Sequence, residues 1–262
     1  MIEIKNLYKS FGDKTVLKGI DCSFQEGKTN LIIGQSGSGK TVLMKCIVGL
    51  FEPTKGDILY DGRSFVGMSK KERTLLRREM GMIFQNAALF DSMSVLENVM
   101  FPLDMFSDKS QQERRERAEQ CLERVNLLDA LNKYPGEISG GMQKRVAIAR
   151  AIVLNPKYLF CDEPNSGLDP KTSLVIDELI HDITVEFGIT TIINTHDMNS
   201  VMGIGEHILY IYEGHREWVG TKEKVVSSDN ERLNNFIFAS DLFRKVKEVE
   251  LLAGHSGKTN GK

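Results

Sequence analysis

The stretch Gly34-Gln35-Ser36-Gly37-Ser38-Gly39-Lys40-Thr41 decides the fold, because it fits the pattern G-x-x-x-x-G-K-[ST] at every fixed position. The apolar residues 30–33 lead into it as a candidate strand, and apolar residues at helical spacing follow it from residue 42 to residue 50. Its glycines let the backbone wrap closely around a phosphate group, and the following helix adds its positive dipole end at the same place. We expect Lys40 to reach the terminal phosphates of a nucleotide and the Thr41 hydroxyl to bind magnesium.

The composition is that of an ordinary globular protein. The 262 residues are 41% hydrophobic and 27% charged, with a net charge of −2, and a chain of this length can bury a sizeable core. The near-neutral charge argues against nucleic-acid binding, and the basic cluster in residues 70–78 is expected to be a solvated helix face. No apolar run is long enough to span a membrane, and residues 1–5 do not resemble a signal peptide. The four cysteines lie far apart, which predicts free thiols in a reducing compartment.

Strand and helix patterns divide the chain into three parts. Residues 1–85 and 156–225 alternate short apolar strands with helices, which predicts a mainly parallel sheet that binds ligands at the carboxyl ends of its strands. Residues 86–155 are helical in pattern and include a capping box formed by Ser94 and Glu97. Residues 226–262 predict a helical extension, with an apolar stripe in residues 236–243, and a disordered tail. Residues 254–259 of the tail echo the phosphate loop, but they lack its glycine spacing and a preceding strand.

Two acids directly follow an apolar strand. Residues 158–161 lead into Asp162 and Glu163, and carboxylates at the end of a buried strand cost free energy unless they have partners. Magnesium takes one or two carboxylates together with phosphate oxygens, so we expect Asp162 in its ligand shell. Glu163 points elsewhere and is expected to be the general base that deprotonates the attacking water.

Two further polar residues follow strands of the same predicted sheet. His196 comes directly after the candidate strand 190–195, and we expect it to contact the γ-phosphate. Gln85 ends the candidate strand 81–85, where its side-chain amide could touch magnesium or the water. The other histidines have no such context and are expected to be structural or on the surface.

A second helix start has the properties of an anion site. Residues 138–143 read Ile-Ser-Gly-Gly-Met-Gln, with Ser139 as a good N-cap and with Gly140 and Gly141 exposing the first N–H groups of a helix. This loop contains no lysine, so it is half of a phosphate site. A chain with one complete site and one half-site is most simply completed by a second copy, which predicts an isologous homodimer with two nucleotides at the interface.

Taken together, these motifs resemble those of the ATPase subunit of an ABC transporter, over about residues 1–225. The family's motifs are matched by Walker A at 34–41, the Q-loop glutamine Gln85, the signature at 138–143, Walker B at 158–163, the D-loop at 166–169 and the switch histidine His196. The resemblance implies an α/β P-loop NTPase of ABC type: a mainly parallel sheet core, an N-terminal antiparallel β subdomain and a helical insertion. It also implies ATP and Mg2+ as cofactors.

The same resemblance adds residues to the nucleotide site. Phe11 would stack on adenine, while Gln143 of the signature and Asp169 of the D-loop would approach the nucleotide at the interface. Val42 and Asn165 depart from the commonest pattern of the family, in which Thr follows Thr41 and Thr or Ser follows Pro164. Neither position is expected to carry chemistry.

Within the family, residues 84–93, 97–99 and 101–103 and the Gly-Gly-Met of the signature resemble the ATPases of MCE-associated lipid transporters, the Mla type. This implies ATP hydrolysis that moves phospholipid between bacterial membranes through a separate integral membrane permease, together with an MCE-type lipid-binding subunit. The chain would then lie on the cytoplasmic face of the inner membrane, with the helical insertion gripping the permease. Three alternatives stay open: an ABC ATPase for another substrate, such as an amino acid or an exported lipoprotein, a non-transport ABC ATPase acting on ribosomes or DNA, and an ATP-binding switch without turnover.

Overall fold

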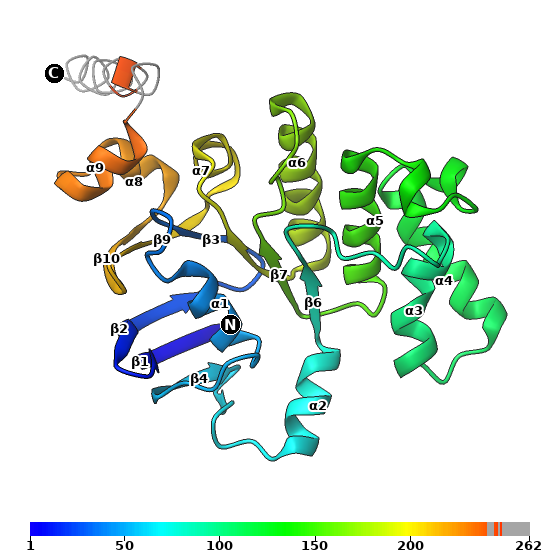
Figure 1. Cartoon of the computed structure of the whole chain (residues 1–262), viewed down its shortest axis with the longest axis horizontal. Helices are drawn as coiled ribbons and strands as arrows, with labels where there is room; N and C mark the ends of the chain where they lie inside the picture. The colour runs from blue at the N-terminus through cyan, green and yellow to red at the C-terminus, as the bar shows by residue number, and fades with distance from the viewer. Residues whose placement is uncertain (240–243, 246, 248–262) are drawn as a thin grey trace, which may run out of the picture.

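A computed structural model describes residues 1–239, 244, 245 and 247, which form two β-sheets and the helices around them (Figure 1). The first sheet is antiparallel, in the order β2-β1-β4-β5, and the second has the order β10-β9-β3-β8-β7-β6. Neighbouring strands of the second sheet are parallel except for the pair β9 and β10 at one edge. The expected mainly parallel sheet with an antiparallel N-terminal part is therefore confirmed.

The bounds of the strands and helices follow the sequence patterns closely. The strands are β1 (Ile2–Phe11), β2 (Lys14–Phe24), β3 (Thr29–Ile33), β4 (Lys55–Tyr60), β5 (Arg63–Ser64), β6 (Met80–Ile83), β7 (Tyr158–Asp162), β8 (Thr190–Asn194), β9 (His207–Tyr212) and β10 (His215–Gly220). The α-helices in the described part of the chain are α1 (Lys40–Ile47), α2 (Lys70–Arg78), α3 (Val95–Phe106), α4 (Gln111–Arg124), α5 (Gly140–Ile152), α6 (Pro170–Phe187), α7 (Met198–Ile204), α8 (Lys222–Val226) and α9 (Glu231–Ile237). Short 3-10 turns cover Leu128–Ala130 and Pro135–Glu137.

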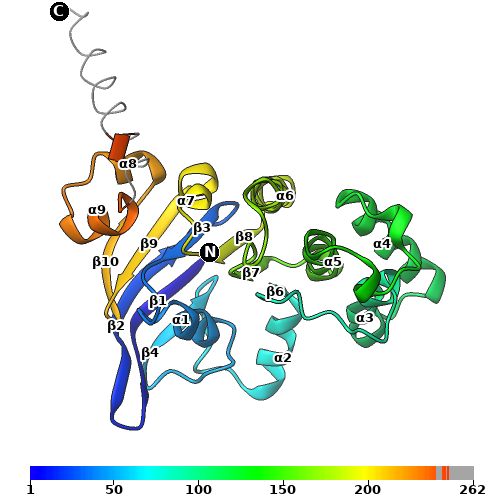
Figure 2. The same cartoon turned by 45° about the horizontal axis from the view of Figure 1, so that its top comes forward.

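The parallel sheet is buried on both faces because successive side chains of a strand point to opposite sides. In β3, Ile32 packs with α1 and the antiparallel sheet, whereas Leu31 and Ile33 pack on the opposite side with the cluster that includes residues of α6 and α7. Helix α1 thus lies between the two sheets, as Figure 2 shows. This packing fixes the start of α1 directly against the end of β3.

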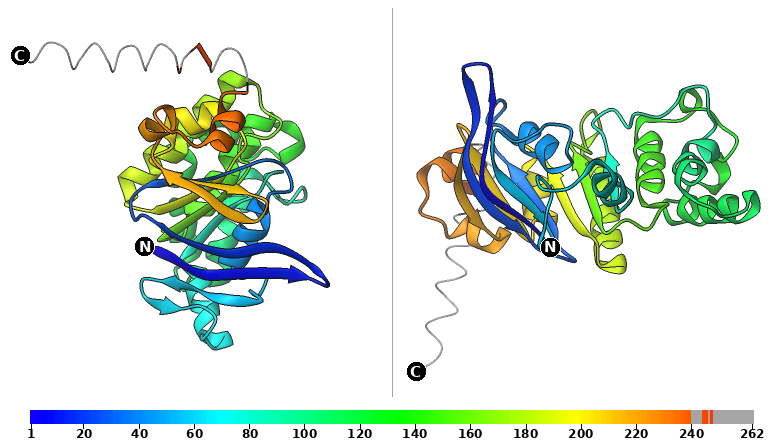
Figure 3. Two further views of the ribbon diagram at one scale, coloured as in Figure 1. Left: turned by 90° about the vertical axis from the view of Figure 1, so that its left-hand side faces the viewer. Right: turned by 90° about the horizontal axis from the view of Figure 1, so that it is seen from below.

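Residues 86–155 contain helices and no strand, and α3, α4 and α5 form a lobe beyond β6, at one end of the molecule (Figure 3). Helix α3 begins at the expected capping box, in which Ser94 accepts from the backbone of Glu97 and the Glu97 carboxylate accepts from the backbone of Ser94. Such reciprocal bonds satisfy donors that a helix start otherwise leaves unpaired. The lobe places α5, which carries the second candidate anion site at its start, next to β6 and α6.

Two sequence expectations about element ends are wrong. Helix α1 ends at Ile47, and Leu50 is 58% exposed rather than on an apolar helix stripe. The reason is Gly49, whose φ of +76° cannot continue a right-handed helix. Strand β6 ends at Ile83, the last residue paired with β7, so Gln85 lies in the loop after the strand and does not end it.

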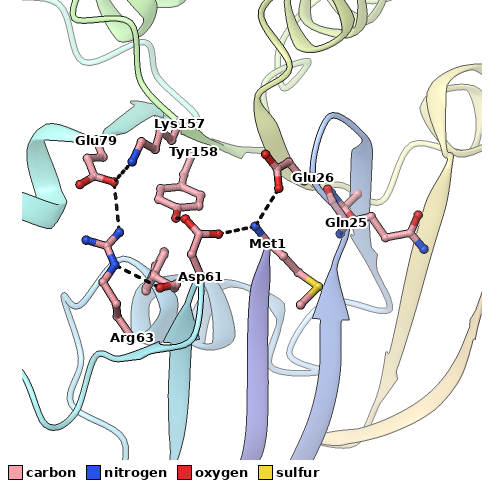
Figure 4. Close-up of polar contacts among 10 residues, drawn as sticks. Met1, Gln25, Glu26, Asp61, Arg63, Glu79, Lys157 and Tyr158 are labelled. Atoms are coloured by element: carbon pink, nitrogen blue, oxygen red, sulfur yellow. Dashed lines mark hydrogen bonds and ion pairs between the residues drawn. The ribbon is translucent and has the colours of Figure 1, made fainter.

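A polar network joins the two sheets at the end where β7 begins (Figure 4). Asp61, just after β4, accepts hydrogen bonds from the Tyr158 hydroxyl at 2.5 Å and from the amino group of Met1 at 2.6 Å. Glu79 lies 3.2 Å from the charged groups of both Arg63 and Lys157. Exposed ion pairs of this kind each contribute about 0–1 kcal/mol, so they add little to the stability of the fold.

The start of the C-terminal segment packs on the core. Ile237 and Phe238 are buried, and the ring of Phe236 stacks on Tyr210 of β9 with centroids 5.3 Å apart. The remainder of the expected apolar stripe, Leu242 and Phe243, and the tail that echoes the phosphate loop, residues 254–259, lie outside the described residues.

Candidate functional site

The phosphate loop joins β3 to α1 in the conformation that its glycines predict. Gly34 and Gly39 have φ values of +153° and +111°, which side chains rarely adopt. A Cβ on Gly34 would lie 2.4 Å from the carbonyl oxygen of Ile211, and one on Gly39 would lie 2.9 Å from the Leu17 side chain. These positions therefore accept only glycine, and the loop keeps room for a ligand above its backbone.

A cavity of about 700 Å3 lies over this loop. Its lining is Val16, Gly34, Gln35, Ser36, Gly37, Gly39, Lys40, Thr41, Val42, Glu163, His196 and Phe236. The remaining loop residue, Ser38, is buried, and its hydroxyl has no hydrogen-bond partner among the described residues. The predicted phosphate loop, general base and switch histidine thus share one cavity.

Lys40 is held at the base of this cavity. Its Nζ donates hydrogen bonds to the carbonyl oxygens of Gly34 at 2.8 Å and Gln35 at 3.1 Å. Burial lowers the pKa of Lys40, although the nearby carboxylates of Glu163 and Asp162 act in the opposite direction. An ammonium group that has lost water in this way gains from a phosphate partner.

Thr41 and Asp162 meet through Asn194, which ends the neighbouring strand β8. The Nδ2 group of Asn194 donates to Asp162 Oδ1 at 2.9 Å and lies 3.4 Å from the Thr41 hydroxyl. A hydroxyl and a carboxylate are the hard oxygen donors that magnesium prefers, and the cradle for phosphate oxygens lies beside them, so the residues present fit this ion. Magnesium bound there would neutralise charge on the phosphates.

Glu163 brings two other predicted residues to the same place. Its Oε1 lies 3.2 Å from Nδ1 of His196, and its Oε2 accepts a hydrogen bond from Nε2 of Gln85 at 3.2 Å. Glu163 itself has a φ of +48°, a strained conformation for a residue with a side chain, and its N–H donates to the Asn194 carbonyl at 2.9 Å. Such strain costs about 1–3 kcal/mol and is typical of functional sites.

The Gln85 side chain is oriented by two acceptors. Besides Glu163, its Nε2 donates to Ser166 Oγ at 3.1 Å. The amide oxygen of Gln85 is therefore the atom that faces away from these two partners, and it is the atom that could approach magnesium or a water. Its place among the metal ligands stays a prediction.

The second candidate anion site is built as expected but lies outside the cavity. Ser139 accepts from the backbone of Met142 as the N-cap of α5, and Gly140 and Gly141 form its first turn. Gln143 donates to the Pro135 carbonyl at 2.9 Å. In the described part of the chain, the cavity lining contains none of the residues 139–143.

The D-loop residue Asp169 is the N-cap of α6. Its carboxylate accepts from the backbone N–H of Thr172 at 3.0 Å and from the Thr172 hydroxyl at 2.5 Å, which lowers the pKa of Asp169. A Cβ on Gly141 would lie 2.8 Å from the Thr172 side chain, so the start of α5 packs closely against this turn. The expected contacts of Ser139, Gly140, Gly141, Gln143 and Asp169 with a nucleotide stay predictions.

Phe11, expected to stack on adenine, is not among the cavity residues. Its ring contacts Phe51 edge-on at 5.2 Å and lies 4.8 Å from the Lys9 ammonium. The adenine contact stays a prediction for the nucleotide-bound protein.

Sequence reasoning missed several residues of the site. Asn194 could have been found, because it is a polar residue that ends an otherwise apolar strand beside two predicted ligands. Val16 and Phe236 line the cavity without any local signal, since they reach it only through the packing of distant elements, whereas Val42 lines it because it directly follows Thr41.

The geometry defines a P-loop nucleotide-binding protein. A family model described as ABC transporter matches residues 17–166, which is more than half of the chain. The chain therefore belongs to the ABC transporter family.

Curated relatives cover most of this chain. The probable ribonucleotide transport ATP-binding protein mkl of Mycobacterium leprae is 37% identical over 236 residues, 90% of this chain and 68% of that protein. The methionine import ATP-binding protein MetN of Clostridium acetobutylicum is 38% identical over 241 residues, covering 92% and 75%. The chloroplastic protein TRIGALACTOSYLDIACYLGLYCEROL 3 of Arabidopsis thaliana is 37% identical over 257 residues, covering 92% and 74%.

Among solved structures, a dimeric post-hydrolysis state of an ATP-binding cassette with ADP and Pi matches with a TM-score of 0.76 at 35% identity. The match covers 85% of this chain and 99% of that one. The chain is accordingly an ATPase that uses ATP and magnesium, and cassettes of its family dimerise and work with membrane permease subunits.

Glu163 is expected to be essential for hydrolysis and dispensable for ATP binding. Glu163→Gln keeps the shape of the side chain but removes the proton acceptor, so we expect ATP hydrolysis to fall about 10²–10⁴-fold. ATP affinity should be retained, because Lys40 and the loop backbone are unchanged. Single-turnover hydrolysis and equilibrium binding of a fluorescent ATP analogue measure the two effects separately. Hydrolysis at the parent rate with intact binding would show that another group is the base.

Proposed function

We propose that two copies of this chain close on two ATP molecules and that the resulting motion drives lipid transport through a separate membrane permease. One observation supports a dimer with shared sites. The cavity is lined by Lys40, Glu163 and His196, while the helix start at Ser139 lies elsewhere on the same chain. A second copy related by a twofold axis supplies that helix start to the first copy and receives the same in return.

The residues of the cavity have complementary roles in hydrolysis. Lys40 and the loop N–H groups hold the phosphates, and the partner's Ser139 and the following glycines cover the γ-phosphate. Glu163 accepts the proton of the attacking water, while His196 and Gln85 hold that carboxylate in place. Asp169, at the adjoining turn, belongs to the dimer interface. Closure excludes water from the site, which strengthens each of these electrostatic contacts.

Helix α5 connects this chemistry to the surface of the helical lobe. It begins at the signature glycines, and two of its cations hold the loop that follows β6. Lys144 Nζ donates to the Gln85 carbonyl, and Arg150 donates to the carbonyls of Ala87 at 2.7 Å and Ala88 at 2.8 Å. Both alanines have positive φ values, of 58° and 48°. This conformation costs free energy for a residue with a side chain, so the loop keeps its shape only while Lys144 and Arg150 hold its carbonyls.

A groove lies beside that loop and fits a helix of another subunit. Its volume is about 440 Å3 and it lies between α2 and α3, with the rings of Phe84, Phe90 and Phe106 each at least 40% exposed. Arg77, Arg78 and Arg150 also line it. Exposed aromatic side chains rimmed by charges are typical of protein interfaces, and the arginines favour a partner helix with carboxylates.

The permease must be a separate subunit in this proposal. None of the helices in the described part of the chain is long and apolar enough to cross a membrane. We place the chain on the cytoplasmic face of the inner membrane, as a peripheral subunit that reaches the bilayer through the groove and its partner. An MCE-type lipid-binding subunit would complete the assembly, and nucleic acid has no place in it.

Lipid is the proposed substrate because residues 84–93, 97–99 and 101–103 and the Gly-Gly-Met of the signature resemble the Mla-type ATPases, and because one relative carries the name of a galactolipid. Methionine import is the second candidate, because a relative with that name is similar to the same extent. Isolation of the complex from native membranes, with mass spectrometry of its partner subunits and bound lipid, decides between them. Bound phospholipid and an MCE-type subunit are expected, whereas a methionine-binding partner would overturn the lipid assignment.

A complementation experiment tests the shared site. Lys40→Ala removes the phosphate lysine and Ser139→Arg blocks the helix start, so each variant alone should lose ATP hydrolysis. In a mixture, a mixed dimer has one composite site with an intact loop from one copy and an intact Ser139 from the other. We expect partial recovery of ATPase activity after the two variants are unfolded and refolded together. No recovery, with mixed dimers demonstrated by differential tags, would contradict the shared site.

Arg150 is predicted to couple the groove to the site. Arg150→Ala frees the carbonyls of Ala87 and Ala88, so stimulation of the ATPase by its membrane partner should fall by about tenfold while ATP affinity is kept. Arg145→Ala is the matched control, because Arg145 on the same helix donates to the carbonyls of Val125 and Asn126 within the lobe. ATPase rates of the native complex in lipid vesicles measure the effect. Equal losses in both variants would indicate a general defect of α5 and no specific coupling.

A further inference from the structure

Asn165 lies two residues after Glu163 and is tied to two helices. Its Nδ2 group donates to Asp177 Oδ1 of α6 at 2.8 Å and to Ser200 Oγ of α7 at 3.2 Å. Both acceptors are deeply buried, with Asp177 3% exposed and Ser200 1% exposed. Burying a carboxylate costs free energy unless the group is paired, so the hydrogen bonds of this cluster are needed to keep Asp177 inside the fold.

The orientation of the Asn165 amide is fixed by its partners. Its Oδ1 is buried and has no hydrogen-bond partner among the described residues. The opposite orientation would place this oxygen against the Asp177 carboxylate, which repels it. One side-chain amide therefore uses both of its N–H groups to join α6 and α7. A Thr or Ser, the usual residue at this position in the family, has one hydroxyl proton and could donate to only one of them.

The cluster joins the two segments that meet at the general base. Asn165 follows Glu163 in the turn after β7, and Ser200 follows His196 in the first turns of α7. The Glu163–His196 contact, at 3.2 Å, is the direct link between the same segments. The backbone of Asn165 also holds the D-loop, because its carbonyl accepts from Leu168 N at 3.2 Å.

We propose that Asn165, held by Asp177 and Ser200, is a positioning residue that sets the separation of Glu163 and His196 and thereby the rate of ATP hydrolysis. The proposal rests on the role of Glu163 given above. It concerns the turnover rate and leaves ATP binding unchanged, because Lys40 and the loop backbone have no contact with the cluster in the described structure.

The charge of Asp177 gives this arrangement a pH dependence. Burial raises the pKa of Asp177 to about 6, although hydrogen bonds from Ser200 and Asn165 lower it. The titratable groups that act on this carboxyl are Asp197 at the start of α7 and Glu178 on its own helix, which both raise its pKa, and the thiol of Cys161 faces it from β7. Below about pH 6 the carboxyl is protonated and loses acceptor capacity for its two partners.

As the pH is lowered through about 6, the rate of ATP hydrolysis and the folding stability should therefore change in opposite directions. Because the pKa of Asp177 is raised on folding, its protonation contributes stability that is present at low pH and is lost as the pH rises through about 6. The turnover rate should fall as the pH is lowered through the same value. A loss of kcat below pH 6 that accompanies a gain in folding stability cannot arise from unfolding.

The experiment compares kcat, KM for ATP and their pH profiles in the full-length chain. Asn165→Ala and Asp177→Ala are expected to lower kcat about tenfold with KM within about twofold, because small misplacement of reacting groups is costly. The double variant should lose no more than either single variant, since both remove the same contact. Asp177→Asn is permanently neutral and has one acceptor oxygen, as the protonated carboxyl does, so its kcat should be lowered at neutral pH and should lack the further fall near pH 6.

Controls separate this proposal from its rivals. Glu178→Gln removes a neighbouring exposed carboxylate on the same helix, so it should keep the rate at neutral pH and move the fall in kcat only slightly to lower pH, because Glu178 is the smallest of the causes acting on the pKa of Asp177. If Asn165→Ala fails to fold in urea titrations, Asn165→Thr, which keeps one donor, should show an intermediate kcat. The positioning role would be overturned by a kcat equal to that of the parent in both Asn165 variants. It would also be overturned by a fall in kcat near pH 6 that persists in Asp177→Asn. If Glu163→Gln also hydrolyses ATP normally, the assignment of the base fails instead.

Discussion

The parallel pairing of β3, β8 and β7 is the constraint on which the rest of the structure depends. Ile32 of β3 pairs with Asn194 of β8, and Asn194 pairs with Asp162 of β7. Because parallel strands end at the same edge, the phosphate loop, the amide and the carboxylate must lie side by side. Segments more than a hundred residues apart thus converge without any loop having to reach across the molecule.

Most polar side chains at this edge are held by another polar group, whereas the Ser38 hydroxyl has no hydrogen-bond partner among the described residues. Lys40 bonds to loop carbonyls, Asn194 joins Thr41 to Asp162, and Glu163 lies between Gln85 and His196. Unpaired, these groups would each carry a desolvation cost. In the proposed closed dimer, the nucleotide, metal and water would become their partners. Asn165 and Asp177 extend the same arrangement into the layer of helices beneath the site.

Helix α5 links this edge to the outer groove. Its first turn carries the signature glycines, while Lys144 and Arg150 further along it hold the loop between β6 and α3. A rigid helix moves as one body, so in the proposed dimer a displacement of its start by a second copy would shift the loop and the groove together. In this proposal, the helix start offered to the nucleotide of a second copy and the groove offered to the permease lie along one element.

The sequence by itself determined the parts that depend on local chemistry. The phosphate loop, the capping box at Ser94, the N-cap at Ser139 and the acids after β7 can all be predicted from the sequence, because glycine spacing, capping residues and polar ends of apolar strands act over a few positions. Only the tertiary structure decided that Gln85 lies in a loop beyond its strand, that Phe236 lines the cavity and that Asn165 joins α6 to α7. These contacts arise from the packing of elements distant in the chain, which no local pattern records.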